Sequence, residues 1–128
     1  MKVTEIALTC YPVTDLRRAR RFYEDVLGLT QSRFFGTEAQ GFIEFDFGPG
    51  TLAIGFGAPV LRPSRGGGAV GLEVDDFEAA IAQLKSSGCT FHLEPLETPV
   101  CHMAVVADPD GNSVTIHRRK TGCESKHS

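Results

Sequence analysis

Hydrophobic and polar residues alternate in short runs along the chain, and each run predicts a β-strand. Alternation of this kind indicates a sheet with one covered face. It occurs at residues 3–10, 41–47, 51–56, 69–74 and 113–117, and shorter apolar runs at 29–35, 89–93 and 101–107 complete the set. The run at 41–47 mixes aromatic and acidic residues, so the sequence leaves open which of its faces lines a cavity. The pattern predicts eight strands.

Two further segments repeat apolar residues at steps of three and four, as amphipathic helices do. The first lies between Asp15 and Gly28, and the second between Asp76 and Gly88. Aspartate is a favoured residue before a helix and glycine a favoured one after it. We expect the buried stripes to be Leu16, Ala19, Phe22, Tyr23, Val26 and Leu27 in the first helix, and Phe77, Ala80, Ile81 and Leu84 in the second.

The stretch from Cys101 to His117 predicts a β-hairpin. Its turn, Asp108-Pro109-Asp110-Gly111, has the residues that a type I turn favours. After the turn, Val114 and Ile116 share one face, which we expect to lie against a helix. The other face then carries a polar triplet, Ser113, Thr115 and His117.

The second half of the chain repeats the first. Ile6 matches Val70 at a separation of 64 positions, and Ile54 matches Ile116 at a separation of 62. Each half has the order βαβββ, and two such copies make one fold. We expect a single domain over residues 1–119, with a first module at 3–56, a linker at 57–68 and a second module at 69–119; residues 120–128 form a polar tail.

Composition narrows the classes of partner. A net charge of −3 over 128 residues argues against a nucleic-acid surface, and no apolar run approaches the ~20 residues that span a membrane. The arginines at 17–21 are interpreted as a solvated helix face, because Glu24 and Asp25 follow four residues after Arg20 and Arg21. The start, MKVTEIAL, has no signal-peptide pattern, so we expect a cytoplasmic protein.

Two motifs carry a family resemblance. The opening VTEIALTCYPVTDLRRARRFYEDVLGL and the DPDGN turn before the last strand resemble the two halves of the vicinal oxygen chelate superfamily, which includes glyoxalase I, bleomycin-resistance proteins and extradiol dioxygenases. The resemblance implies an α+β fold in which two βαβββ modules form a curved eight-stranded mixed sheet around a cavity, with the helices outside. It also implies a homodimer.

Comparison with the resembled family implies that this chain is a member that lacks the usual metal ligands. Family metalloenzymes bind a divalent ion at positions that match Glu5, Ala53, Ala69 and Thr115. A divalent site needs about three protein ligands, and only Glu5 is a good one here. We therefore expect no metal and no cofactor. A displaced site stays open, because His102 and His117 with Glu5 or Glu73 are further potential ligands.

Two further combinations of side chains are candidates for catalysis. Cys101 adjoins His102, but neighbouring residues of a strand point to opposite faces, so this histidine is badly placed to activate the thiol. Glu5 and Glu73 are both predicted to face inward, where burial beside each other would raise the pKa of one of them and make it a usable base; the alternative is that Glu73 lies at the rim in water.

The sequence thus favours metal-independent binding of a small organic molecule, in the manner of the family's drug-sequestering members. A cavity wall that mixes aromatic, small and hydrogen-bonding groups suits such a ligand. The alternatives are a glyoxalase-like lyase or isomerase or a dioxygenase, using a displaced metal or a carboxylate base, and an interaction module. The candidate ligand contacts are Glu5, Thr9, Glu44, Glu73, Cys101, His102, Thr115 and His117.

Overall fold

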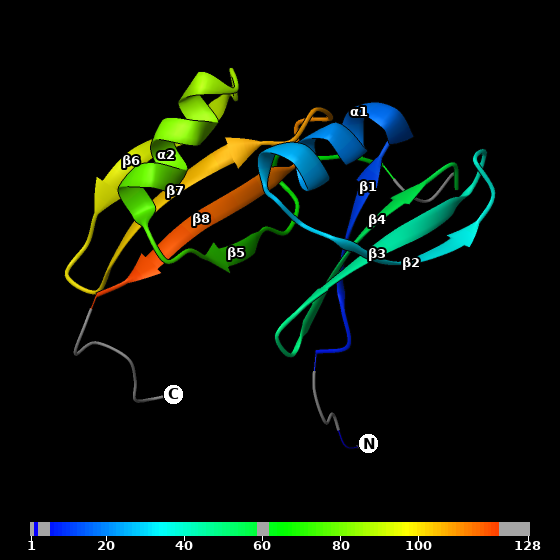
Figure 1. Cartoon of the computed structure of the whole chain (residues 1–128), viewed down its shortest axis with the longest axis horizontal. Helices are drawn as coiled ribbons and strands as arrows, with labels where there is room; N and C mark the ends of the chain where they lie inside the picture. The colour runs from blue at the N-terminus through cyan, green and yellow to red at the C-terminus, as the bar shows by residue number, and fades with distance from the viewer. Residues whose placement is uncertain (1, 3–5, 59–61, 121–128) are drawn as a thin grey trace. The chain divides into compact units, whose positions relative to one another are not determined.

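The computed structural model describes residues 2, 6–58 and 62–120 (Figure 1). The chain divides into two compact units, Met1–Ser64 and Arg65–Ser128. Each contains one four-stranded mixed sheet and one helical segment, so the fold is of the α+β class. None of the helices in the described residues is long and apolar enough to cross a membrane.

The first unit contains a sheet whose strands are hydrogen-bonded in the order β1-β4-β3-β2. Strand β1 is parallel to β4, and the other neighbours are antiparallel. Its elements are β1 (Thr9–Val13), α1 (Leu16–Arg20), η1 (Arg21–Val26), β2 (Gln31–Gly36), β3 (Gly41–Phe47) and β4 (Gly50–Phe56). The helix η1 is a π-helical continuation of α1.

The second unit repeats this arrangement, with the order β5-β8-β7-β6 and β5 parallel to β8. Its elements are β5 (Val70–Glu73), α2 (Phe77–Ser86), β6 (Phe91–Glu97), β7 (Cys101–Ala107) and β8 (Ser113–Arg119). The equal strand order confirms the repeated βαβββ pattern. One cavity shared by both modules stays a prediction.

The predicted helix ends are confirmed. The Asp15 carboxylate accepts a hydrogen bond from the Arg18 backbone N–H at 3.0 Å, and the Asp76 carboxylate accepts one from the Ala79 N–H at 3.0 Å. These bonds satisfy backbone N–H groups of the first helical turn, which have no carbonyl acceptor within the helix. Gly28 and Gly88 both have φ of +77°, which ends each helix in a conformation that favours glycine.

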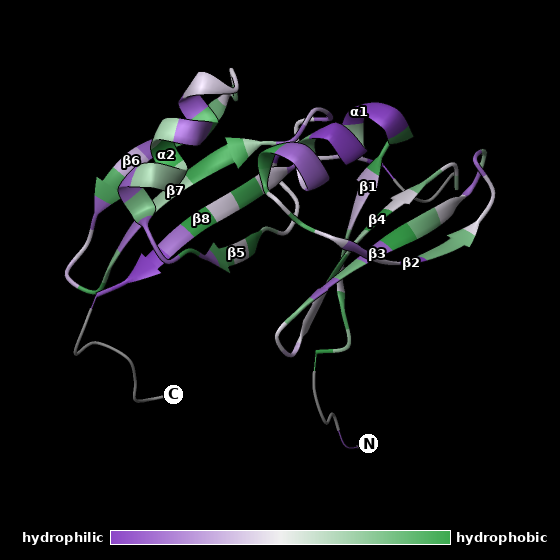
Figure 2. Cartoon of the chain, viewed as in Figure 1, coloured by the Kyte–Doolittle hydropathy of each residue, from purple (hydrophilic) through white to green (hydrophobic). Residues whose placement is uncertain are grey.

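Each helix covers one face of its own sheet. In the first unit the fully buried Tyr23 ring stacks between Tyr11 of β1, at 6.4 Å between centroids, and Phe45 of β3, at 6.2 Å. In the second unit α2 contacts β8, where Val114 and Ile116 are buried as predicted. Colouring by hydropathy shows apolar residues along the strands and mostly hydrophilic residues in α1 (Figure 2).

The predicted hairpin between β7 and β8 is confirmed. The Gly111 N–H donates to the Asp108 carbonyl at 2.9 Å, and Gly111 has φ of +88°. The Asp108 carboxylate is buried and accepts from the N–H groups of Asp110 and Asn112, both at 2.9 Å, and from the Asn112 side-chain amide at 2.8 Å. These bonds fix the turn and hence the strand that follows it.

The first strand was predicted three residues too early. Residues 6–8 lie outside β1, and Ile6 is 85% exposed, while Tyr11 and Val13 supply the buried side chains. The expected strand ended at Cys10, whereas Tyr11 and Pro12 both lie within β1. Proline is tolerated here because β1 is an edge strand, whose outward N–H groups need no ladder partner.

A second correction concerns the strand expected at 89–93, which begins and ends later in the chain. Strand β6 runs through Pro95 to Glu97. It is also an edge strand, and its pairing with β7 shifts register between Phe91 and Leu96. Irregular edges of this kind accommodate proline.

Candidate functional site

Each sheet has a helix-covered face and a second face, which we call its open face. Because residues paired across a sheet share a face, the register assigns each side chain. The open face of the first sheet carries a row formed by Cys10, Ala53, Glu44 and Arg33. A neighbouring row is formed by Pro12, Gly55, Phe42 and Phe35.

A charged cluster occupies one end of this open face. The Arg33 guanidinium lies 3.2 Å from a Glu44 carboxylate oxygen and 3.9 Å from one of Asp46. The Thr51 hydroxyl donates to Asp46 at 2.7 Å. The Glu44 side chain is only 14% exposed, whereas that of Arg33 is 57% exposed. The cluster therefore has a fixed inner carboxylate and an accessible outer cation.

An aromatic pair lies beside the charged cluster. The rings of Phe35 and Phe42 are 5.0 Å apart between centroids, and both side chains remain substantially exposed. They line a pocket of about 500 Å³ at the end of the sheet, together with Gly36, Thr37, Gln40, Gly41, Phe56 and Ala58. Small-molecule sites commonly have this volume and an apolar lining with a few polar groups.

The open face of the second sheet carries a carboxylate–imidazole pair. Glu73 lies opposite His117 in the β5–β8 pairing, and its carboxylate oxygen is 2.6 Å from His117 Nδ1. The other oxygen accepts from the Arg119 backbone N–H at 2.7 Å. Desolvation by itself would raise the pKa of Glu73, but these two hydrogen bonds and the nearby positive charges lower it overall. The carboxylate is thus held in its charged form beside the imidazole.

Apolar side chains adjoin this pair. His117 lies opposite Met103, which is paired in turn with Leu96, and Thr115 lies between Gly71 and Val105. The mixture resembles that of the first sheet, with a polar pair next to apolar side chains, of which Leu96 is exposed and Met103 and Val105 are half-buried.

Two predicted contacts lie on the helix-covered faces. Thr9 is paired with Leu52, which is paired with Phe45, and the Phe45 ring contacts the helix. The three-residue shift of β1 explains this, because an odd shift turns every side chain to the other face. His102 lies 5.6 Å from the Phe77 ring of α2, between centroids.

The other predicted contacts are distributed as follows. Glu44, Glu73, Thr115 and His117 lie on the open faces. Cys101 is buried, with its sulfur 3.2 Å from the Thr98 hydroxyl. Glu5 lies outside the described residues, so its pairing with Glu73 stays a prediction. As ligand contacts, all of these residues stay predictions.

The sheet register changes which residue of the first strand occupies the position of a metal ligand in the family's metalloenzymes. Thr9 lies opposite Leu52 and Val70 lies opposite Val114, so β1 matches β5 at a separation of 61 positions and not 64. The counterpart of Ala69 is therefore Leu8, and not Glu5. The four matching positions then carry Leu8, Ala53, Ala69 and Thr115. This set contains no carboxylate, imidazole or thiolate.

No three His, Cys, Asp or Glu side chains gather as in a metal site within residues 2, 6–58 and 62–120. Sequence reasoning missed Arg33, Asp46 and the Phe35–Phe42 pair. The helix caps, Asp15 and Asp76, are also 61 positions apart, and aligning the modules on them gives the correct register for β1.

The chain is similar to known proteins over nearly its whole length. The profile of the Glyoxalase/Bleomycin resistance protein/Dioxygenase superfamily matches residues 5–116. The structure resembles TnmS3, an antibiotic binding protein from Streptomyces sp. CB03234, with 24% identity, a TM-score of 0.77, and coverage of 94% of this chain and 99% of that one.

Two further solved structures are similar. A glyoxalase/bleomycin resistance protein from Streptomyces sp. CB03234 has 25% identity and a TM-score of 0.73, covering 89% of this chain and 100% of that one. The trypanothione-dependent glyoxalase I of Leishmania major has 22% identity and a TM-score of 0.73, covering 91% of this chain and 87% of that one. No protein of curated function matches the sequence.

Proposed function

The chain belongs to the Glyoxalase/Bleomycin resistance protein/Dioxygenase superfamily, and we propose that it binds a small organic molecule on its open sheet faces without a metal ion. One observation carries the proposal: the exposed Phe35–Phe42 pair lines a pocket of about 500 Å³, and the Arg33–Glu44 ion pair lies two residues from this aromatic pair along the same strands. The likeness in fold to an antibiotic binding protein supports it.

The chemistry of this face favours a flat, partly aromatic ligand with polar substituents. Aromatic rings stack at the spacing that Phe35 and Phe42 already adopt with each other. Arg33 is accessible enough to donate to an acceptor of the ligand, and Glu44 is held to accept from a donor. On the second sheet we propose Glu73, Thr115 and His117 as contacts, because they share its open face.

The first experiment uses 1-anilinonaphthalene-8-sulfonate, a fluorescent planar aromatic sulfonate, as the probe. Phe42→Ala should weaken its binding about tenfold, because the ring that it would stack on is lost. Phe47→Ala is the matched control, since both phenylalanines belong to β3 and are 36% and 41% exposed, but they lie on opposite faces. Equal losses in the two variants, with unchanged far-UV circular dichroism, would contradict the proposed site.

Metal independence is tested separately. Protein purified without chelator should contain no stoichiometric transition metal by elemental analysis, and probe binding should be unchanged after EDTA treatment. Stabilisation by several degrees on adding Ni, Zn, Fe(II) or Mn would contradict this part of the proposal.

A second candidate function is proton-transfer catalysis, which the Glu73–His117 pair favours. A carboxylate 2.6 Å from Nδ1 orients the imidazole and supports it as a general base. Turnover of the hemithioacetal of methylglyoxal, abolished by His117→Gln, would favour this candidate over simple binding. Binding of the probe without turnover would favour the first.

We also propose that the protein is a homodimer, on the family resemblance. Sedimentation equilibrium decides it: a mass of twice 13.8 kDa is expected, and a monomer at high micromolar concentration would contradict it.

A further inference from the structure

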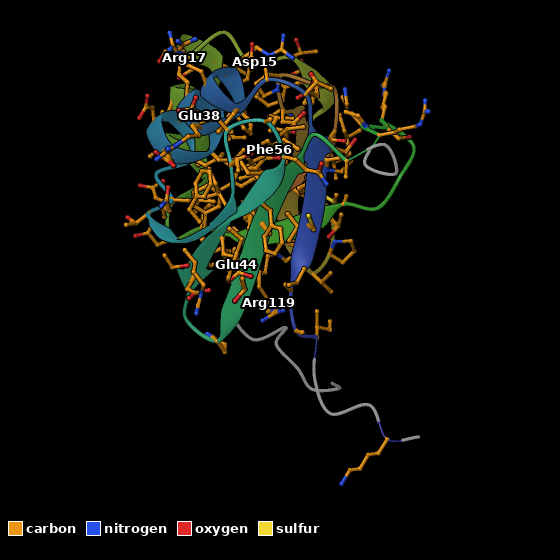
Figure 3. The ribbon with its side chains drawn as sticks, turned by 90° about the vertical axis from the view of Figure 1, so that its right-hand side faces the viewer. Asp15, Arg17, Glu38, Glu44, Phe56 and Arg119 are labelled. Carbon is orange, nitrogen blue, oxygen red and sulfur yellow. The ribbon has the colours of Figure 1, made fainter. Side chains whose placement is uncertain are left out.

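The first unit has a second pocket, which the proposed function does not use. It has a volume of about 500 Å³ and lies between the α1–η1 helix and the turn at 37–40. Arg17 from the helix and Glu38 from the turn lie on the same side of this unit (Figure 3). The charged residues that line the pocket are Arg17, Arg20, Arg21, Glu24, Asp25 and Glu38.

Among the described residues, the charges that line this pocket form one ion pair with each other. Arg20 and Glu24 make two bonds, at 2.9 Å and 3.3 Å, which use both oxygens of the carboxylate. The expected second pair, between Arg21 and Asp25, is not formed. Within the described part of the chain, the side chains of Arg17, Arg21, Asp25 and Glu38 make no ion pair with one another. The pocket therefore contains two cations and two anions that do not neutralise each other directly.

The spacing of the two arginines allows both side chains to contact the same acidic group. Arg17 and Arg21 are four residues apart along the helix, so their side chains leave the same side of it. Like charges at this spacing repel each other, and an acidic group bound between them relieves the repulsion. The planar guanidinium groups also match the geometry of a carboxylate or phosphate.

A simple anion is a poor match for the whole pocket, because it would also face Asp25 and Glu38. A simple cation is a poor match for the opposite reason. A molecule that carries one negative and one positive charge matches both the arginines and the carboxylates of the pocket. We propose that this pocket binds a small zwitterion, whose carboxylate or phosphate contacts Arg17 and Arg21 and whose ammonium contacts Glu38 and Asp25.

The test uses 6-aminohexanoate as the probe and follows ¹H–¹⁵N chemical shifts of the whole chain. Saturable shifts are expected at residues 16–25 and 37–40. Hexanoate and hexylamine, which each lack one of the charges, should bind at least tenfold more weakly. If either of them binds as tightly as the zwitterion, the proposal is wrong and the pocket selects a single charge.

Two variants and a matched control locate the site. Arg21→Gln and Glu38→Gln should each weaken 6-aminohexanoate binding at least fivefold. Arg18→Gln removes the same charge from the same helix, but Arg18 bonds to Thr14 and does not line the pocket, so it should leave the affinity within twofold. Equal weakening in Arg18→Gln would show non-specific charge attraction and overturn the assignment. Binding of the aromatic probe at Phe42 should be unaffected by all three changes, which separates failure of this inference from failure of the proposed function.

Discussion

Replacing Asp108 by alanine removes the acceptor that holds the turn between β7 and β8. The Asp108 carboxylate is 3% exposed and accepts two backbone N–H groups and the Asn112 side-chain amide, at 2.8–2.9 Å. Hydrogen bonds to a charged group contribute about 1.5–3 kcal/mol each, and a buried donor that loses its acceptor costs about 1–3 kcal/mol. Asn112 is 2% exposed, so water reaches its amide poorly.

We expect Asp108→Ala to lower the free energy of unfolding by about 3 kcal/mol, because one buried amide and one buried N–H lose an acceptor while the N–H of Asp110 turns to water. Asp108→Asn should cost less, about 1–2 kcal/mol, because one oxygen still accepts while its new NH₂ faces the Asn112 amide. With a slope of about 1.5 kcal/mol/M, the alanine variant should shift the urea midpoint by about 2 M.

The assay is urea unfolding followed by circular dichroism at 222 nm. Asp75→Ala is the control, since Asp75 is an exposed carboxylate of the same unit, and it should change stability by less than about 0.5 kcal/mol. A loss below about 0.5 kcal/mol in Asp108→Ala, with an unchanged slope, would refute the role given to this carboxylate.

Three further predictions concern the second unit. The folded-state pKa of Glu73 lies below its ordinary value of 4.5, so the stability that its hydrogen bonds contribute is present above about pH 4.5 and is lost as the pH falls through the lower folded pKa. The free energies of unfolding of wild type and Glu73→Gln should therefore differ by up to about 1 kcal/mol at pH 7, a small value because the carboxylate is 44% exposed. Their urea midpoints should converge at low pH, and a difference that does not change with pH would contradict this. His102→Ala should lower the melting temperature by removing the contact with Phe77, but should leave probe binding unchanged. Gly111→Ala should lower the free energy of unfolding by about 1 kcal/mol, because Gly111 has a φ of +88°, which alanine adopts only with strain; a Cβ at this position would meet no neighbouring atom. An unchanged urea midpoint would contradict this reasoning.

The sequence by itself determined the local features of this fold. The caps at Asp15 and Asp76 and the turn at 108–111 were predicted correctly; of the expected helical stripes, Ala19, Phe22, Tyr23 and Leu84 are buried and the other members are half-buried. Each depends on atoms only a few residues apart in the chain: a carboxylate and the N–H three residues later, or a proline and a glycine within one turn. Such interactions are visible in the order of the residues.

The tertiary structure decided on which faces the side chains of β1 and β7 lie. The faces of Thr9 and His102 depend on pairing with strands about 15 to 45 residues away, and a shift of one or three residues reverses a face while leaving the alternation intact. The sequence of β1 allowed both registers, since Ile6 and Leu8 alternate as well as Tyr11 and Val13 do. Burial of Tyr11 against Tyr23 of the helix selected the later one, and with it the residues that are available to a ligand.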